Sequence, residues 1–156
     1  MKKHLWIPGL IILTFSVAWA ACSKSSSNNN NNNTMVTLMT KSTWKFDTSG
    51  IDLDKNGTVD QEDPILDPCF KDNTFVFNKD STVVMDEGAD KCSTNPQTAT
   101  YSWTITNGNP AILKSTVNPI LAEGVKVYSL TDTKLVVYKD TSIYNVSFWY
   151  VMSLKH

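Results

Sequence analysis

Residues 52–63, DLDKNGTVDQED, carry the side chains of this chain with the clearest potential for chemistry. Asp or Asn stands at positions 1, 3, 5, 9 and 12 of this twelve-residue stretch, and glycine stands at position 6. Calcium binds about six to eight oxygen ligands, and a twelve-residue loop with this spacing is one way in which proteins supply them. The stretch therefore predicts a calcium-binding loop.

The spacing also assigns a role to each ligand. The predicted calcium ligands are Asp52, Asp54, Asn56, Thr58, Asp60 and Asp63. Thr58 would bind through its backbone carbonyl, Asp60 directly or through water, and Gly57 allows the sharp turn between the two halves. Because Asp63 is shorter than the glutamate commonly found at position 12, we expect weak binding, with a Kd of about 10⁻⁴ to 10⁻³ M. The alternative is a polar surface turn with solvated carboxylates.

The flanks of this loop differ from a helix–loop–helix calcium site. Residues 46–50 are typical of a strand end and a turn, and Pro64 follows the loop directly. Proline can begin a helical turn but does not favour a long exiting helix at this point. We therefore expect the loop to connect the first and second strands of a β domain.

The N-terminal region predicts export and lipid anchoring. Residues 1–21 combine a basic start, a short apolar run and small residues before Cys22, as in a lipoprotein signal peptide. The prediction is lipidation at Cys22, a disordered Ser/Asn-rich tether over residues 22–34, and a location in the bacterial cell envelope. Simple secretion after cleavage and an uncleaved anchor are the alternatives. Periplasmic and surface exposure both remain open.

Composition limits the function of the predicted domain, residues 35–156. The chain has 14 basic residues, all of them lysine, against 15 acidic residues, so its net charge is −1. This balance gives no electrostatic basis for binding nucleic acid. Its two histidines are His4, in the predicted signal, and the terminal His156, so no histidine-based catalytic site can form in the body of the domain. We expect no enzyme activity and name no catalytic residue.

Two cysteines remain after Cys22, at positions 69 and 92. In an oxidising compartment such a pair predicts a disulfide between Cys69 and Cys92, with two free thiols as the alternative. Closing a loop of about 24 residues contributes about 3 to 4 kcal/mol in the chain-entropy model.

From residue 73 onward the pattern is that of strands and hairpins. Residues 98–106, TATYSWTIT, alternate apolar and polar side chains, and Asn107-Gly108 is typical of a hairpin turn. We count about eight strands in a meander and predict an all-β, antiparallel, up-and-down eight-stranded barrel. A helical turn is expected before the first strand and a loop over residues 118–124. Apolar residues on both faces of the last strand, 144–154, predict that its outer face is covered.

Five aromatic residues of the predicted strands have two alternative roles. They are Trp44, Tyr101, Trp103, Phe148 and Trp149. They could fill the core of the barrel or line a ligand cavity inside it, and the core is the more common outcome at alternating spacing.

Several stretches together resemble a known family. They are Trp44 in the first strand, CFKDNTFVF, a second cysteine in KCSTNP, a central YSWTI and a late VYSLTDTKLVV. Residues 36–154 thereby resemble the lipocalin-like domain of bacterial lipoproteins, with Ser42 where transport lipocalins often carry glycine. The resemblance implies a lipocalin-like barrel but no particular activity.

Together these features predict a non-catalytic envelope lipoprotein with a lipocalin-like barrel and a calcium-binding loop. The expected partners are a membrane, through the lipid anchor, and a small apolar ligand or an envelope protein. The alternative is a protein- or glycan-interaction module of an envelope complex.

Overall fold

The structure is a computed structural model that describes residues 28–92, 94 and 96–156. The predicted signal peptide, the predicted lipidation site Cys22 and the first part of the predicted tether lie outside the described residues. Within the described part of the chain, no helix combines the length and the apolar character needed to cross a membrane.

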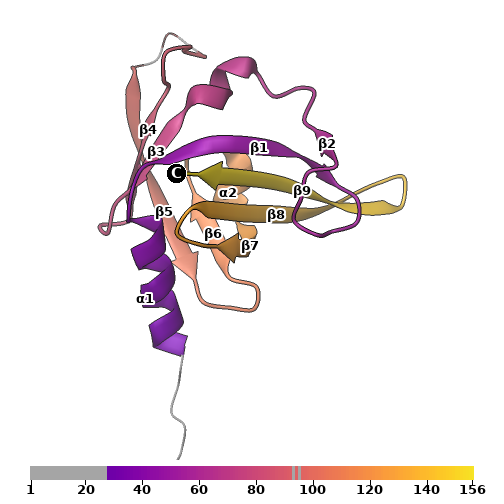
Figure 1. Ribbon diagram of the computed structural model, residues 1–156, viewed down its shortest axis with the longest axis horizontal. Coiled ribbons are helices and arrows are strands. Elements are labelled where there is room, and N and C mark those ends of the chain that lie inside the picture. The colour runs from indigo at the N-terminus through magenta and orange to yellow at the C-terminus, as the bar shows by residue number, and fades with distance from the viewer. Residues whose placement is uncertain (1–27, 93, 95) are drawn as a thin grey trace, which may run out of the picture.

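Nine strands and three short or medium helices make up the described chain. In order they are α1 (Asn28–Met39), β1 (Trp44–Asp52), β2 (Gln61–Glu62), the 3-10 helix η1 (Pro68–Asp72), β3 (Thr74–Phe77), β4 (Thr82–Asp86), β5 (Thr98–Thr106), β6 (Ile112–Ser115), α2 (Pro119–Glu123), β7 (Val125–Leu130), β8 (Lys134–Ile143) and β9 (Val146–Lys155). Each strand from β3 to β9 pairs antiparallel with the next, and β1 pairs with both β3 and β9. The sheet therefore closes in a ring (Figure 1).

The antiparallel order of consecutive hairpins was predicted correctly. The sheet has nine strands rather than about eight because β2, only two residues long, pairs with β1 beyond the ring itself. This pairing matches Gly50 to Glu62 and Ile51 to Gln61. It returns the chain to β1 immediately after the acidic loop. A strand of two residues is too short to show an alternating pattern, so the sequence could not reveal this pairing.

One part of the ring's interior is filled with side chains. Its core cluster comprises Met39, Trp44, Phe77, Val83, Trp103, Ile105, Leu113, Leu121, Val125, Leu135, Val137 and Leu154. The indole N–H of buried Trp44 donates to the carbonyl of Met39 at 2.9 Å, and that of Trp103 donates to Asn78 at 3.0 Å. Because both N–H groups have acceptors, these large side chains are buried without an unpaired polar atom. The core reading is therefore right for both tryptophans.

Helix α1 corrects the predicted tether. Residues 22–34 were expected to be disordered, but α1 begins at Asn28 and has 12 residues. Asparagine has poor helix propensity, so the helix is stabilised by packing at its apolar end. Met39 is fully buried in the core cluster, and Met35 and Val36 pack against it. Tertiary contact thus overrides local propensity here.

Helix α2 corrects the loop predicted over residues 118–124. Asn118 is its N-cap, with the side-chain oxygen accepting from the N–H of Leu121 at 2.8 Å. Pro119 occupies the first helical position and Gly124 follows the last. Asn, Pro and Gly at these positions favour a helical turn as well as a loop, and buried Leu121 decides between them by packing into the core.

A second apolar cluster covers the outer face of β8 and β9, as predicted for the last strand. It contains buried Val136, Tyr138 and Val151, against which Val59 and Trp149 pack. The rings of Tyr138 and Trp149 stack with centroids 3.9 Å apart. Since Val59 belongs to the acidic loop, this cluster holds the loop against the outside of the ring.

Candidate functional site

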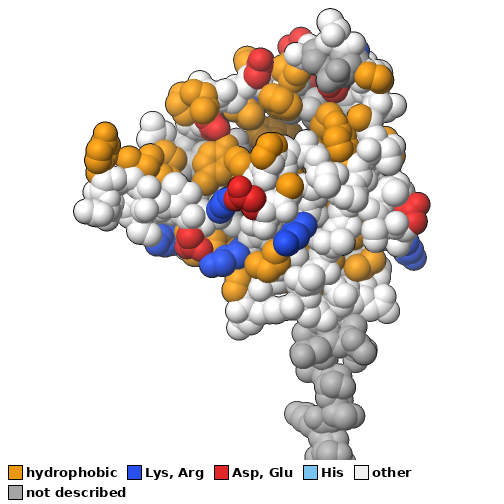
Figure 2. All heavy atoms as spheres, turned by 180° about the vertical axis from the view of Figure 1, so that it is seen from behind, with side chains coloured by type: hydrophobic (Ala, Val, Ile, Leu, Met, Phe, Trp, Pro, Cys, Tyr) orange, Lys and Arg blue, Asp and Glu red, His pale blue; other side chains and the backbone are white. Residues whose placement is uncertain are grey.

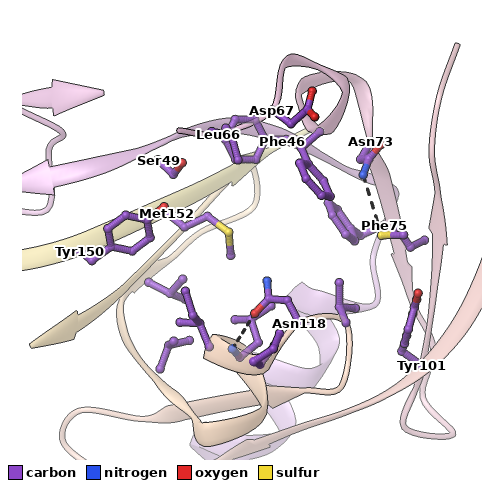
Figure 3. Close-up of a pocket in the computed structure, with 18 of the residues that line it drawn as sticks. Phe46, Ser49, Leu66, Asp67, Asn73, Phe75, Tyr101, Asn118, Tyr150 and Met152 are labelled. Atoms are coloured by element: carbon purple, nitrogen blue, oxygen red, sulfur yellow. Dashed lines mark hydrogen bonds between the residues drawn. The ribbon is translucent and has the colours of Figure 1, made fainter. Parts of the chain in front are cut away.

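The remaining part of the interior is a cavity of about 720 Å³. Its walls come from β1, β3, β4, β5, β7, β8 and β9, and from η1 and α2. Figure 3 shows Phe46, Phe75, Met152 and Tyr150 around the central space. A volume of this size is within the range of small-molecule sites in proteins.

Apolar and aromatic side chains dominate the lining. They include Phe46, Leu66, Phe70, Phe75, Met85, Tyr101, Val117, Ile120, Leu121, Val125, Val137, Tyr138, Tyr150 and Met152. Leu121, Val125 and Val137 belong to the core cluster as well, so the cavity begins where the filled part ends. Of the five aromatics with two readings, Tyr101 lines the cavity, Trp44, Trp103 and Phe148 are buried, and Trp149 lies in the outer cluster.

The rim of the cavity is also apolar. Phe70 on η1 and Ile120 on α2 both line it and are 43% and 45% exposed. Figure 2 shows apolar side chains gathered around a recess on this face of the molecule, with lysine and acidic side chains beside it. Lining residues that are this exposed at the rim give an apolar molecule a surface to contact as it enters.

A disulfide fixes the η1 side of the cavity. Cys69 on η1 and Cys92 are bonded, with Cα atoms 5.1 Å apart, which confirms the predicted pair. Asp67 caps η1, its side chain accepting from the N–H of Cys69 at 3.4 Å. Because Cys92 and Phe70 both line the cavity, the covalent link holds this wall in place.

Few charged groups reach the cavity. Asp67 and buried Glu87 line it, and so does Lys139. The ammonium of Lys139 donates to the carboxylate of Glu123, and this hydrogen bond holds the pKa of Glu123 below its usual value. The balance of charge along the wall is therefore acidic.

A short chain of polar contacts joins the cavity wall to the end of the acidic loop. The Tyr150 hydroxyl donates to Asp63 Oδ2 at 2.6 Å, and the Asp63 N–H donates to the carbonyl of Ser49 at 3.0 Å. Burial is the main cause of a raised pKa for Tyr150, and the bond to the Asp63 carboxylate adds to it. Ser49 and Tyr150 both line the cavity.

The acidic loop brings three of its predicted ligands together. Carboxylate oxygens of Asp52, Asp54 and Asp60 all lie within 4.8 Å of one another. Asp52 is fully buried, and its two oxygens accept from the N–H groups of Asn56 at 3.2 Å and Gly57 at 2.7 Å. The loop therefore wraps around this carboxylate.

The next ligands in the sequence lie inside the same loop. Asn56 donates from its amide to Asp54 Oδ2 at 2.8 Å, while its amide oxygen accepts from the N–H of Thr58 at 2.8 Å. Asp60 Oδ2 accepts from the N–H of Leu53 at 2.7 Å, which ties the end of the loop to its beginning. These contacts give the loop a defined shape.

Backbone conformation and the outer cluster position the loop. Gly57 has φ of 84°, and a Cβ there would lie 2.4 Å from a ring carbon of Tyr128. Only glycine fits such an approach without displacing the ring. Lys55, also at positive φ of 60°, reaches away from the carboxylates and donates to Ser147 Oγ at 2.8 Å.

Asp63 differs from the prediction at position 12. Its carboxylate bonds the Tyr150 hydroxyl and the N–H of Ile65 and is not part of the group of three. The physical reason is the pairing of β2 with β1, which begins right after Asp60 and carries Asp63 along β1, away from the loop. The structure thus groups three of the six predicted ligands, Asp52, Asp54 and Asp60.

Among the described residues, none of the three carboxylates takes part in an ion pair. The ion pairs seen there use Asp132, Asp140, Asp47 and Glu123 as their acids. A buried carboxylate such as Asp52 is costly unless a cation or a proton neutralises it. The donor set is therefore one that a hard divalent cation fits.

Sequence reasoning missed two polar groups of the cavity, Ser49 and Asn118. A serine within a strand and an asparagine before a proline carry no signal that separates a ligand contact from an ordinary turn or surface position. Comparison with protein families, with curated proteins and with solved structures finds no match for this chain.

Proposed function

We propose that this protein is a non-catalytic, lipid-anchored lipoprotein of the bacterial cell envelope whose lipocalin-like barrel binds a small apolar ligand. The observation that carries the proposal is the cavity of about 720 Å³ inside the closed sheet. A structural protein of this kind would gain stability by filling such a space, since each buried apolar contact contributes. Space retained behind an apolar rim is what a ligand-binding protein requires.

Binding of an apolar reporter tests this function. The full chain should raise the fluorescence of N-phenyl-1-naphthylamine in a saturable manner with a single class of site. Met152→Trp, which places a larger side chain on the cavity wall, should abolish the signal, while Val76→Trp changes a half-exposed position and serves as the matched control. Equal binding by both variants would place the reporter on the outer surface and contradict the proposal.

The acidic loop supplies a calcium site in this proposal. Asp52, Asp54 and Asp60 are the carboxylate ligands, and Asn56 and Thr58 add oxygens from the same loop. Bound calcium would neutralise the buried Asp52 and hold the loop on the outer cluster. The ion has a structural role here, since the loop lies outside the ring.

Calorimetric titration of the full chain with calcium chloride tests the site. Without a contribution from Asp63, we expect a Kd of about 10⁻³ M, at the weak end of extracellular sites. Calcium at about ten times Kd should stabilise the fold by about 1.4 kcal/mol. Asp54→Asn should remove the heat of binding, and Glu62→Gln, an exposed acid on β2 outside the group, should not. Melting temperatures that are the same in calcium and in chelator would refute the site.

The lipid anchor rests on the sequence before the described residues. Mass spectrometry of the protein purified from bacterial membranes should find an acylated N-terminal cysteine at position 22. Cys22→Ser should release the protein from the membrane fraction, and an unmodified, membrane-free wild-type protein would remove the anchor from this proposal.

A second candidate function is interaction with an envelope protein or glycan. The β8–β9 hairpin favours it, because Ile143, Tyr144 and Val146 at its tip are 55%, 97% and 57% exposed. Pull-down from envelope extracts with wild-type protein and with an Ile143→Ser, Tyr144→Ser, Val146→Ser variant would test it. A partner retained equally by both would rule out the tip as the contact.

A further inference from the structure

We propose that the ligand of the cavity is an uncharged apolar molecule with a hydroxyl or carbonyl oxygen, for which Ser49 and Asn118, on different walls of the cavity, are the hydrogen-bond partners offered. This inference rests on the proposed ligand-binding function and specifies the chemical class of the ligand. It follows from two of the polar side chains that line the cavity and from the charges along its wall.

Ser49 presents a buried hydroxyl that no hydrogen bond of regular geometry satisfies. The side chain is 5% exposed, and its Oγ has no hydrogen-bond partner. Ser49 is opposite Met152 in the β1–β9 pairing, and both residues line the cavity. A side-chain hydrogen-bond contact from Ser49 opposes the rise in the pKa of Tyr150, so the Tyr150 hydroxyl lies close to this Oγ, although the distance and angles of a regular hydrogen bond are not met. A buried hydroxyl without a partner is costly, so a ligand oxygen that bonds it gains that energy.

Asn118 offers a second polar group from α2. Its side-chain oxygen is engaged as the helix cap by the N–H of Leu121 at 2.8 Å. The amide nitrogen donates to no other described residue, and Figure 3 shows it turned toward the cavity. Because the oxygen is held by the cap, the orientation of the amide is fixed, and the group presented to a ligand is an N–H donor. Such a donor selects an acceptor oxygen.

The charges along the wall exclude an anionic head group. Asp67 and Glu87 line the cavity, and the ammonium of Lys139 is already paired with Glu123. A carboxylate such as that of a fatty acid would lie near the acidic side chains of this wall, while the one lysine among the described lining residues is paired with Glu123. An ammonium group would satisfy the wall but would face the N–H donor of Asn118, which repels it. A neutral oxygen suits both Ser49, which donates or accepts, and Asn118, which donates.

Competition among ligands of equal chain length tests this inference. The full chain, loaded with N-phenyl-1-naphthylamine at pH 7.5, is titrated with 1-dodecanol, dodecanoate or dodecylamine below their critical micelle concentrations. We expect 1-dodecanol to displace the reporter at a concentration at least tenfold lower than either charged ligand. This factor corresponds to about 1.4 kcal/mol, roughly one or two net hydrogen bonds.

Two variants connect the preference to the named residues. Ser49→Ala removes the hydroxyl and should weaken 1-dodecanol about fivefold relative to the reporter, whose affinity is measured for the same variant. Asn118→Asp keeps an oxygen to cap Leu121 but replaces the donor with a carboxylate, so it should weaken 1-dodecanol and shift the preference toward dodecylamine. The Ser49→Thr variant retains a hydroxyl and should retain the wild-type preference. Unchanged melting temperatures would show that each variant is folded.

The possible outcomes distinguish a wrong ligand class from a failure of the proposed ligand-binding function. If the reporter binds and dodecanoate or dodecylamine competes best, the cavity binds ligands but the proposed class is wrong. If 1-dodecanol competes best and Ser49→Ala has no effect, the assignment of the oxygen contact is wrong. If the reporter does not bind at all, the proposed ligand-binding function fails as well.

Discussion

The filled and hollow parts of the ring's interior are built from the same strands. On β9, Leu154 is 4% exposed within the core cluster, while Met152, two residues earlier, lines the cavity. On β8, Leu135 lies within the core cluster, and Val137, two residues later, belongs to that cluster and also lines the cavity. The difference comes from the neighbouring helices, because α1 inserts Met39 into the core, whereas η1 and α2 border the space. One part is thus arranged for stability and the other for a ligand.

Alanine substitution of Leu154 and of Met152 should show the largest difference in stability between the filled and the hollow part. Leu154→Ala should lower the free energy of unfolding by about 2 to 5 kcal/mol, because it creates a void in close-packed surroundings. Met152→Ala should cost about 1 kcal/mol, since one side of this residue already borders space. Urea denaturation measures both values. Equal losses would show that the hollow part is packed as tightly as the filled part.

The disulfide should contribute next, and it belongs to the hollow part. Replacing Cys69 and Cys92 together by alanine should lower the free energy of unfolding by about 3 kcal/mol through a freer unfolded chain. The variant should also bind the apolar reporter more weakly, because Cys92 and η1 form one wall of the cavity. Denaturation curves and reporter titrations with and without reductant test both effects. Unaltered reporter affinity would mean that η1 keeps its position without the covalent link.

The filled part was more accessible to sequence reasoning than the hollow part. Alternation within residues 98–106 correctly places Trp103 and Ile105 in the core, because burial on one face follows directly from the period of a strand. The same alternation includes Tyr101, which lines the cavity instead. Periodicity reports which face a residue occupies, but not whether the space beyond that face is filled. That depends on α1, whose Asn-rich sequence predicts disorder.

The acidic loop shows the same limit at its end. Local spacing correctly brings Asp52, Asp54 and Asp60 into one group, since a tight loop allows few arrangements of residues so close in sequence. Asp63 lies outside this group because β2 pairs with β1. The hydroxyl of Tyr150, which is distant in the sequence, donates a hydrogen bond to the Asp63 carboxylate instead. A contact between residues 63 and 150 depends on closure of the ring, so no pattern within the loop could reveal it.

The wall of the filled part should show the greater sensitivity to acid. Asp47 bonds Lys155 at 2.8 Å, and this contact, together with Ser153 and Lys134, lowers its pKa below 3.8. Its contribution is therefore present above pH 3.8 and is lost as the pH falls through the lowered pKa of the folded state. We expect less than about 1 kcal/mol from these partly exposed ion pairs. Between pH 5 and pH 2.5, the melting temperature of Asp47→Asn should fall by less than that of the wild type, and identical slopes would contradict this.

The hollow part should respond instead to alkali, with the smallest effect. Burial and the bond to Asp63 raise the pKa of Tyr150 above 10.0, so the folded state resists loss of this proton. The Tyr150 phenol therefore ionises at lower pH in the unfolded state than in the folded state. Its contribution to the free energy of unfolding is fully present below pH 10.0 and declines as the pH rises past that value. Tyr150→Phe loses the hydrogen bond, which costs about 1 kcal/mol at neutral pH, but its melting temperature should decline less than that of wild type between pH 9 and 11. Tyr144→Phe, at a 97% exposed position, is the control and should follow the wild-type curve. If Tyr150→Phe also follows that curve, the hydroxyl faces water in solution, and the hollow part is more open than the closed ring indicates.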